Sequence, residues 1–308
     1  MRACVIGGAG FIGRRVIRLL AAQGHEVVCF DLNPAPLFDD LGKAVRLVRG
    51  DVTRFEDLVG TFSAHRPEVV INLGYMIGDH APRLAFRVNI QGMDNCFEAA
   101  RLTDVRHVVF ASSIAVNGSQ RLYGDRDIVE DDPPSAAKQY AVHKVFNEWQ
   151  AKEYREKHGM RITGIRPGNI AGVDKLVGSV DHVQVVVKPA LGQKARFTYR
   201  DRMRSVIYID DAAEIFARLA VAQPRHPIYF TGGETFSIGQ IADMVKAIIP
   251  DADISFEHDT GGEFEKGAGA WRFSNARLVE EFGLRFPSYR ERVGEMIELV
   301  RRQARGQG

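Results

Sequence analysis

Three side chains near the middle of the sequence have the types and spacing needed for proton transfer. Tyr140 and Lys144 occur in YAVHK, within a helical stretch, and residues four apart lie on one face of a helix. A phenol titrates at about pH 10, and a neighbouring ammonium lowers that pKa. Ser113 follows the apolar run 107–111. Its hydroxyl can hydrogen-bond a substrate oxygen while Tyr140 exchanges the proton, which predicts acid–base chemistry on an alcohol or a carbonyl.

A glycine-rich segment, GGAGFIG at 7–13, predicts a binding loop for a dinucleotide pyrophosphate. Gly7 allows a tight turn, Gly10 lets the backbone approach the pyrophosphate, and Gly13 lets the following helix pack close to the sheet. The helix N-terminus supplies free N–H groups and a partial positive charge. Glycine-rich turns also occur for packing alone, but the position between a strand and a helix favours a cofactor loop that includes Phe11 and Ile12.

Two acidic residues follow the next predicted strands. Asp31 ends the second strand, where a carboxylate accepts hydrogen bonds from the adenosine ribose and repels a 2′-phosphate. Leu32 and Asn33 bring no positive charge, so NAD is favoured over NADP; the alternative is a carboxylate that only caps a turn. Asp51 and Val52 follow the third strand, where Asp51 either receives the adenine amino group, with Val52 packed on the ring, or is the N-cap of a helix at 54–63.

The elements that must position these residues alternate along the first 170 residues. Strands are predicted at 2–7, 26–30, 45–49, 67–73, 107–111 and 161–165, and helices at 11–23, about 84–102 and 136–158. This alternation predicts an α/β fold with a Rossmann-type, doubly wound parallel sheet covered on both faces. Such sheets bind ligands at the carboxyl ends of their strands.

Regularity weakens after Pro167, and residues 170–204 show no clear period. A strand is predicted at 205–209, followed by helices from Asp210, at 237–249 and at 288–304, with a Gly-rich loop at 259–270. We therefore expect a cofactor-binding domain at 1–170, to which 205–232 returns. Residues 171–204 and 233–308 are expected to form a smaller α/β substrate lobe.

Composition excludes several classes of protein. The 308 residues are 45% hydrophobic and 26% charged, with a net charge of +2, whereas a nucleic-acid-binding protein usually shows a strong basic excess. No apolar run reaches the roughly 18 residues that span a bilayer, and the N-terminal segment does not read as a signal peptide. Cys4, Cys29 and Cys96 form no CxxC pair, which favours buried thiols in a reducing cytoplasm.

The sequence resembles the extended short-chain dehydrogenase/reductase family along nearly its whole length. The resemblance rests on an ordered set of motifs: GGAGFIG at 7–13, Asp31, Asp51-Val52, Asn89 in VNIQG, SSIAVNG at 112–118, YAVHK at 140–144 and RPGN at 166–169. It implies NAD as cofactor and Ser113, Tyr140 and Lys144 as the catalytic set, with Lys144 also holding the nicotinamide ribose. Cofactor contacts are implied for Asn72, Leu73, Gly74, Asn89, Pro167 and Asn169.

The chain departs from the family pattern at two positions. A His-Leu-Ala-like segment is usual where this chain has Asn72-Leu73-Gly74-Tyr75, and the usual Tyr of SSxxxYG is Asn117 here. The first departure affects side-chain contacts at Asn72. The second removes an aromatic contact that sugar-nucleotide members often use.

Three reactions are represented within the family, and two of them stay open for this chain. A dehydratase commonly carries Asp-Glu after the catalytic hydroxyl, where this chain has Ile114-Ala115. An epimerase must anchor a nucleotide diphosphate, for which Arg204 and Arg272 are candidates, since arginine binds phosphate oxygens bidentately. FTYRDRMRSVIYIDD at 197–211 and the segment 236–259 are more similar to short-chain L-threonine dehydrogenases, which take small substrates.

These observations favour an NAD-dependent dehydrogenase of a secondary alcohol over an NDP-sugar 4-epimerase. A dinucleotide sensor without activity is a third reading, which the catalytic Tyr140 disfavours because a sensor does not need it. Tyr75 is expected in the substrate site or else in the core, and Trp271 and Arg272 on a lid or a plain surface loop. With Ser113, Asn169 and Arg204, these residues make the expected substrate set.

No metal site is predicted, because the nine histidines include no HxxxH or HExxH pattern. The resemblance also implies a homodimer, formed by the helices at about 84–102 and 136–158. No nucleic-acid or membrane partner is expected.

Overall fold

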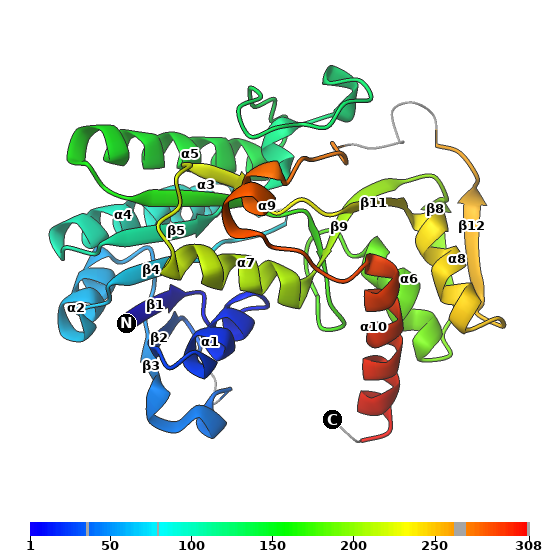
Figure 1. Ribbon diagram of the computed structural model, residues 1–308, viewed down its shortest axis with the longest axis horizontal. Coiled ribbons are helices and arrows are strands. Elements are labelled where there is room, and N and C mark those ends of the chain that lie inside the picture. Colours follow the sequence, from blue (N-terminus) through cyan, green and yellow to red (C-terminus); the bar gives the residue numbers. More distant parts are fainter. Residues whose placement is uncertain (35–36, 79, 262–268, 307–308) are drawn as a thin grey trace. The chain divides into compact units, whose positions relative to one another are not determined.

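The computed structural model describes residues 1–308 except 35–36, 79, 262–268 and 307–308 (Figure 1). The chain divides into two compact units. The first comprises Met1–Val116, Ala136–Arg166 and Asp210–Tyr229, and the second Asn117–Ser135, Pro167–Ile209 and Phe230–Gly308. Residues 117–135, which were expected in the first domain, therefore group with the second unit. The returning segment is 210–229 where 205–232 was expected.

The first unit is built on a seven-stranded sheet with the order β10-β6-β5-β4-β1-β2-β3. Neighbouring strands from β3 to β6 run parallel. The order reverses at β1, which pairs with β2 on one side and β4 on the other. This is the Rossmann-type order, whose ligand site lies at the reversal. The strands are β1 (Arg2–Ile6), β2 (Glu26–Asp31), β3 (Val45–Arg49), β4 (Val69–Asn72), β5 (His107–Ala111), β6 (Ile162–Arg166) and β10 (Ile228–Phe230).

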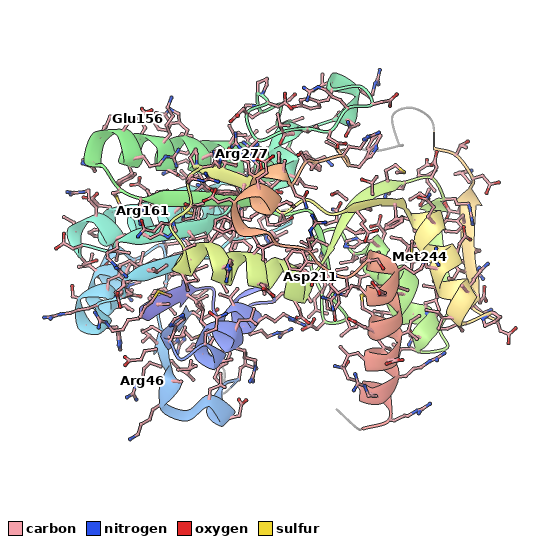
Figure 2. All side chains as sticks on the ribbon, viewed as in Figure 1. Arg46, Glu156, Arg161, Asp211, Met244 and Arg277 are labelled. Carbon is pink, nitrogen blue, oxygen red and sulfur yellow. The ribbon has the colours of Figure 1, made fainter. Side chains whose placement is uncertain are left out.

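The strand sequences account for this arrangement. In β1, Ala3, Cys4, Val5 and Ile6 are all at most 1% exposed, as expected of a parallel strand covered on both faces. The edge strand β3 differs, because Arg46 and Arg49 are exposed there. Figure 2 shows Arg46 on this strand, and charged side chains on an edge disfavour pairing with another chain.

Helices cover both faces of this sheet. One apolar core joins β1, β4 and β5 to α2 (Phe55–His65), α4 (Gly92–Leu102) and α5 (Gln139–His158), through side chains such as Leu58, Phe97 and Ala151. On the other face, α1 (Gly13–Ala22) packs on β1 and β2. Its Arg15 pairs with Asp210 of α7 (Ile209–Val221), with Nε 3.0 Å from Oδ1. The short 3-10 helices η1 (Asp39–Ala44) and η3 (Ile114–Asn117) complete these segments.

The helix expected at about 84–102 is present, but its hydrogen-bond pattern changes from α to π and back to α. It runs as α3 (Pro82–Phe86), a π-helical turn η2 (Arg87–Gln91) and α4. Its helical backbone continues through both junctions, since Phe86, Arg87, Gln91 and Gly92 all keep helical dihedral angles. Asn89 lies within the π turn, a feature that is often found at functional sites.

The second unit contains a three-stranded sheet, β11-β9-β7, and a two-stranded pair, β12-β8. The helices α6, α8 and α10 pack on one another, and capping boxes at Ser237 and Ser288 fix the starts of α8 and α10. Its elements are η4 (Gln120–Leu122), β7 (Asn169–Ala171), α6 (Asp181–Ala190), β8 (Ala195–Tyr199), β9 (Met203–Tyr208), β11 (Glu234–Ser237), α8 (Ile238–Ile248), β12 (Ile254–His258), α9 (Ala276–Phe282) and α10 (Tyr289–Ala304).

The three cysteines are free thiols in buried positions, in agreement with the buried thiols that the sequence predicted. Across the described part of the chain, no helix combines the length and the apolarity that crossing a membrane requires.

Candidate active site

The glycine loop follows β1 at the point where the strand order reverses. Gly7 has a φ of +72°, which favours glycine, and a Cβ there would lie 2.8 Å from the Gly74 nitrogen. A Cβ on Gly13 would lie 2.3 Å from the Gly7 oxygen. Both glycines are thus required by close backbone packing, at the tight turn and at the helix start where the sequence predicted them.

Gly10 differs from its neighbours because it is exposed and open. A Cβ on it would meet one heavy atom within 4 Å, the Gly7 oxygen at 3.1 Å. The hydrogen bond from Arg14 N to Gly10 O begins the helical ladder. The N–H groups of Phe11, Ile12 and Gly13 therefore precede it, at the positive end of α1. An open backbone surface beside these donors fits a dinucleotide pyrophosphate.

Asp31 fastens the glycine loop to β2. Its Oδ2 accepts a hydrogen bond from Ala9 N at 3.1 Å, and its Oδ1 accepts one from Asn33 N at 3.1 Å. The carboxylate thus caps the turn that follows β2 and also remains partly exposed at the sheet edge. Both of the roles considered for Asp31 are compatible with this position.

Asp51 does not serve as the N-cap of α2, because that helix begins at Phe55 and its N-cap is Arg54. The Asp51 carboxylate instead accepts a hydrogen bond from Thr53 N at 2.8 Å, closing a turn. Val52 is fixed next to it, since its carbonyl accepts a hydrogen bond from Asn95 Nδ2 at 2.9 Å. Contact of Asp51 and Val52 with adenine stays a prediction.

Asn72, the last residue of β4, has its side chain inside the protein. Asn72 is 1% exposed, and its Oδ1 accepts a hydrogen bond from Gly74 N at 3.1 Å. The main chain of Leu73 extends the ladder, with its N–H donating to Ile6 O at 2.9 Å. The backbone of Leu73 and Gly74 therefore lies beside the end of β1, whereas the buried Asn72 side chain hydrogen-bonds within the protein.

Asn89 holds the next residues of this segment. Its Oδ1 accepts a hydrogen bond from Met76 N at 2.8 Å, and its Nδ2 donates to Met76 O at 3.1 Å. Asn147 of α5 donates in turn to Asn89 O at 2.8 Å. The Asn89 amide thus positions the segment that carries Tyr75, a role that sequence analysis did not give it. A cofactor contact of Asn89 stays a prediction.

Ser113, Tyr140 and Lys144 come together in the first unit. Ser113 follows β5, and its hydroxyl lies close enough to the phenol of Tyr140, in the first turn of α5, to lower the pKa of that phenol. Lys144, one turn further, is 2% exposed, and its Nζ donates to Ala111 O at 2.6 Å. The structure thus brings together the three residues that the sequence selected.

Tyr75 completes this cluster with a second phenol. The Lys144 Nζ lies 3.2 Å from the centre of the Tyr75 ring. The Tyr75 and Tyr140 rings meet edge to face, with centroids 5.5 Å apart. The Tyr75 hydroxyl is buried, and no described residue hydrogen-bonds to it. Tyr75 therefore packs against Tyr140 and Lys144, and its contact with a substrate stays a prediction.

Burial governs the titration of these groups. It raises the pKa of Tyr140, while the hydrogen bond from Ser113 lowers it. Burial also lowers the pKa of Lys144 well below its usual value, against the charge of Glu148. We expected a Tyr140 pKa lowered by Lys144, and the structure gives a raised one because desolvation of the phenolate dominates. Tyr140 is consequently a protonated acid at neutral pH in this state.

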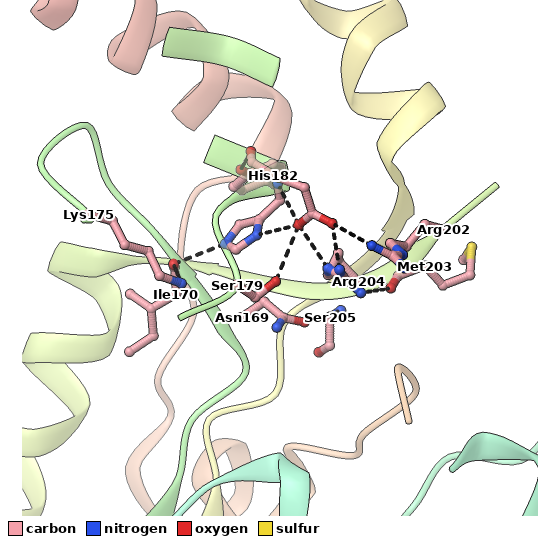
Figure 3. Close-up of polar contacts among 11 residues, drawn as sticks. Asn169, Ile170, Lys175, Ser179, His182, Arg202, Met203, Arg204 and Ser205 are labelled. Carbon is pink, nitrogen blue, oxygen red and sulfur yellow. Dashed lines mark hydrogen bonds and ion pairs between the residues drawn. The ribbon is translucent and has the colours of Figure 1, made fainter. Parts of the chain in front are cut away.

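The second unit holds the remaining predicted residues. Asn169 is fixed in β7, where its Oδ1 accepts a hydrogen bond from Ser205 N at 3.2 Å. Pro167 begins a segment of this unit and is buried. Arg204 lies in β9, and Figure 3 shows it beside His182 and Arg202. A contact of Asn169 or Pro167 with the cofactor stays a prediction.

The Arg204 guanidinium is paired with the carboxylate of Asp181, a residue that sequence analysis did not identify. Asp181, at the start of α6, accepts a hydrogen bond at Oδ1 from Arg204 Nε at 3.0 Å, and its Oδ2 accepts one from the second guanidinium nitrogen. Arg202 lies 3.8 Å from the same Oδ2. Burial raises the pKa of Asp181, but the hydrogen bond from His182 and the charge of Arg204 outweigh it and hold the pKa well below its usual range.

Trp271 and Arg272 form hydrogen bonds with other residues of the second unit. Both backbone N–H groups donate to Gln120 Oε1, at 3.2 and 3.1 Å. The Arg272 guanidinium pairs with Asp127, with Nε 3.0 Å from Oδ1. The loop expected at 259–270 lies largely outside the described residues, which omit 262–268. A substrate contact of Trp271 or Arg272 stays a prediction.

Fold and site together define a class: a Rossmann-type dinucleotide-binding protein with a serine, a tyrosine and a lysine clustered in its first unit. The model of the NAD dependent epimerase/dehydratase family matches residues 3–239. The chain belongs to this family. The match confirms the resemblance found in the sequence, and NAD as the family's cofactor agrees with the expected one.

Individual relatives have different activities. The chain is 29% identical over 252 residues to a UDP-glucose 4-epimerase from Mycolicibacterium smegmatis, covering 78% of this chain and 77% of that protein. A UDP-glucose 4-epimerase from Thermus thermophilus in complex with NAD superposes with a TM-score of 0.84 at 24% identity, over 98% and 99% of the two chains. An L-threonine dehydrogenase from Cupriavidus necator gives the same TM-score of 0.84 at 20% identity, over 96% and 99%.

Proposed function

We propose that this protein is an NAD-dependent dehydrogenase that interconverts a secondary alcohol and its ketone. Tyr140 exchanges a proton with the substrate oxygen, and Ser113 hydrogen-bonds that oxygen and the Tyr140 phenol. Lys144 holds a positive charge beside both, which favours the phenolate during proton transfer. NAD, when bound, accepts the hydride from the carbinol carbon.

Residues of the first unit would hold the cofactor. The glycine loop offers its backbone to the pyrophosphate, and Asp31 offers a carboxylate oxygen to the adenosine ribose. Val52, Leu73 and Gly74 flank the end of β1, from which the loop starts. Lys144 would donate to the nicotinamide ribose. The carboxylate of Asp31 repels a 2′-phosphate and therefore favours NAD over NADP.

The contact between Asp181 and Arg204 is the observation that favours a dehydrogenase over an epimerase. Arg204 was one of the two candidates, with Arg272, for anchoring a nucleotide diphosphate, and its guanidinium instead binds a carboxylate through two nitrogens. A pyrophosphate would have to displace Asp181 and would then face its negative charge. This arrangement supports a small substrate that lacks a diphosphate.

The second candidate is an NDP-sugar 4-epimerase. The similarity to UDP-glucose 4-epimerases along about three quarters of the chain favours it. Such a reaction would use the same Tyr140 and Ser113, but the NADH formed would be consumed within each turnover. A nucleotide diphosphate would also need an anchor other than Arg204 in its observed pairing.

Two measurements separate these candidates. The enzyme is mixed with NAD and a panel of hydroxy-amino acids, free sugars, aromatic alcohols and UDP-sugars, and NADH absorbance is recorded. Continuous NADH formation with one alcohol supports a dehydrogenase. Interconversion of UDP-hexoses without net NADH overturns the proposal.

Calorimetric titration with UDP supplies the second measurement. The wild-type protein should bind UDP at best weakly, whereas Asp181→Asn should bind it more tightly, because the variant removes the negative charge from Arg204. Tight binding of UDP by the wild-type protein would favour the epimerase.

The Tyr140→Phe variant tests whether Tyr140 takes part in catalysis at all. Unchanged turnover in this variant would contradict both the dehydrogenase and the epimerase hypotheses.

We also propose that the protein is a cytoplasmic homodimer. Val142, Phe146 and Trp149 are exposed on α5 at helical spacing, which makes an apolar stripe, and such stripes mark interaction surfaces. Light scattering should give twice the chain mass, and Trp149→Glu should reduce it. A monomer at micromolar concentration would contradict the dimer.

A further inference from the structure

A buried ion pair lies behind the cluster of Ser113, Tyr140 and Lys144. Arg166, the last residue of β6, donates through Nε to Glu148 Oε1 at 2.8 Å and through a terminal nitrogen to Oε2 at 2.7 Å. The two side chains are 4% and 13% exposed. The bidentate geometry satisfies both carboxylate oxygens, which a buried ion pair requires.

Ser112 connects this pair to the catalytic serine. Its hydroxyl donates to Glu148 Oε1 at 2.5 Å, and its backbone N–H donates to Ile165 O at 2.6 Å. Ser112 directly precedes Ser113. The end of β5, from which Ser113 projects, is therefore fastened to α5 by a side chain and to β6 by the backbone.

Glu148 is also aligned with the other two members of the cluster. Tyr140, Lys144 and Glu148 follow one another at intervals of four residues along α5, so they share a helix face. The buried Lys144 amine contacts Ala111 O, the Tyr75 ring and, further away, the Tyr140 ring. Burial lowers its pKa, and Glu148 is the carboxylate that raises it. His143 is the other titratable neighbour whose charge interacts with Lys144.

We propose that Glu148 is a positioning residue of this active site: it fixes Ser113 through Ser112 and places its carboxylate one helical turn beyond Lys144. The role in turnover rests on the proposed function, whereas the effect on Lys144 does not, because it concerns the folded chain alone. The hydrogen bonds of the Glu148 carboxylate go to Ser112 and Arg166. It acts through Ser112 and through its field at Lys144.

The first experiment measures Lys144 directly. Protein labelled with 13C at the lysine ε-carbons is titrated by NMR, and the Lys144→Met variant assigns the resonance. Glu148→Gln retains the side-chain size but removes the charge, so the pKa of Lys144 should fall by about one unit. Glu148→Asp keeps the charge and should restore most of the shift. Glu156→Gln, on the exposed part of the same helix (Figure 2), should leave Lys144 unchanged.

The second experiment follows turnover against pH, with the substrate found in the panel above. Because Lys144 loses its charge at lower pH in Glu148→Gln, the alkaline limb of kcat should move to lower pH. Ser112→Ala, which keeps the charge, should lower kcat without moving that limb. An unchanged Lys144 pKa in a folded Glu148→Gln protein would overturn the proposal, even if no substrate is found. A shifted pKa without turnover would count against the dehydrogenase alone.

Discussion

The amine of Lys144 lies 3.2 Å from the centre of the Tyr75 ring. This contact places a bulky aromatic side chain against both the lysine and Tyr140. Asn89 holds the backbone of the next residue, Met76, at both of its polar groups. Tyr75 therefore has a fixed place in the cluster, and we expect it to limit the room around Tyr140.

We expect Tyr75→Ala to widen the site. The variant should lower kcat/KM for the native alcohol and raise it for bulkier alcohols, while Tyr75→Phe should keep the preference because it retains the ring. Contact of a cation with an aromatic ring contributes about 0.5–2 kcal/mol, so Tyr75→Ala should also change the pH dependence set by Lys144. Steady-state kinetics over the substrate panel measures both effects. Equal substrate preference in wild type and Tyr75→Ala would remove Tyr75 from the substrate site.

Gly13→Ala should disrupt the cofactor loop, because the added Cβ would lie 2.3 Å from the Gly7 oxygen. We expect the affinity for NAD to fall by about tenfold or more, which corresponds to at least about 1.4 kcal/mol. Gly60→Ala is the matched control: it lies inside α2 with no heavy atom within 4 Å of an added Cβ. Calorimetric titration with NAD compares them, and equal affinities would refute the loop as the binding site.

Asp31→Asn should relax the preference for NAD. The amide keeps an acceptor for Ala9 N or Asn33 N but removes the negative charge that repels a 2′-phosphate. The ratio of kcat/KM for NADP to that for NAD should rise by about tenfold, the effect of about 1.4 kcal/mol. If this ratio is unchanged, Asp31 does not face the adenosine ribose and serves only the turn.

His107 should make the stability of the first unit sensitive to acid. It is 2% exposed, with Nε2 3.0 Å from Thr163 Oγ1, and burial lowers its pKa to about 4. In the unfolded chain this histidine takes up a proton at about pH 6.5, so its contribution to the free energy of unfolding is fully present above that pH. As the pH falls from 6.5 towards 4, the free energy of unfolding decreases by about 3 kcal/mol, because the unfolded state binds this proton and the folded state does not. Urea unfolding between pH 7 and 4 should show a weaker decline in His107→Gln; parallel declines would contradict this assignment.

The strands of the first unit could be predicted closely, because apolar runs between turn residues mark them: β3 and β5 have the predicted bounds, and β1, β2, β4 and β6 differ by one or two residues at their ends. The π turn at Arg87–Gln91 could not, since one added residue hardly disturbs helical periodicity. In 170–204 the sequence shows no period, yet it forms α6 and β8. There Pro189, inside α6, and the short exposed strand obscure the pattern.

Some residues of the candidate site could likewise be predicted from the sequence, and others could not. Ser113, Tyr140, Lys144 and the glycines follow local motifs, so their positions could be read directly. Asp181 and Glu148 were missed because their partners, Arg204 and Arg166, are 23 and 18 residues away. Pairs of residues so far apart in the sequence leave no spacing pattern by which they could be predicted. Arg204 could be recognised as a cation by sequence, but its engagement with a carboxylate required the fold.

The π turn at Arg87–Gln91 holds one residue more than an α-helical turn would, so α3 and α4 keep nearly the relative orientation that a continuous α-helix gives. Removing one residue within the turn should therefore let the segment relax to a plain α-helix with Phe97 still in the core. The hydrogen bonds between Asn89 and Met76, which start inside the turn, would be lost. The extra residue thus serves the segment that carries Tyr75 rather than the packing of α4.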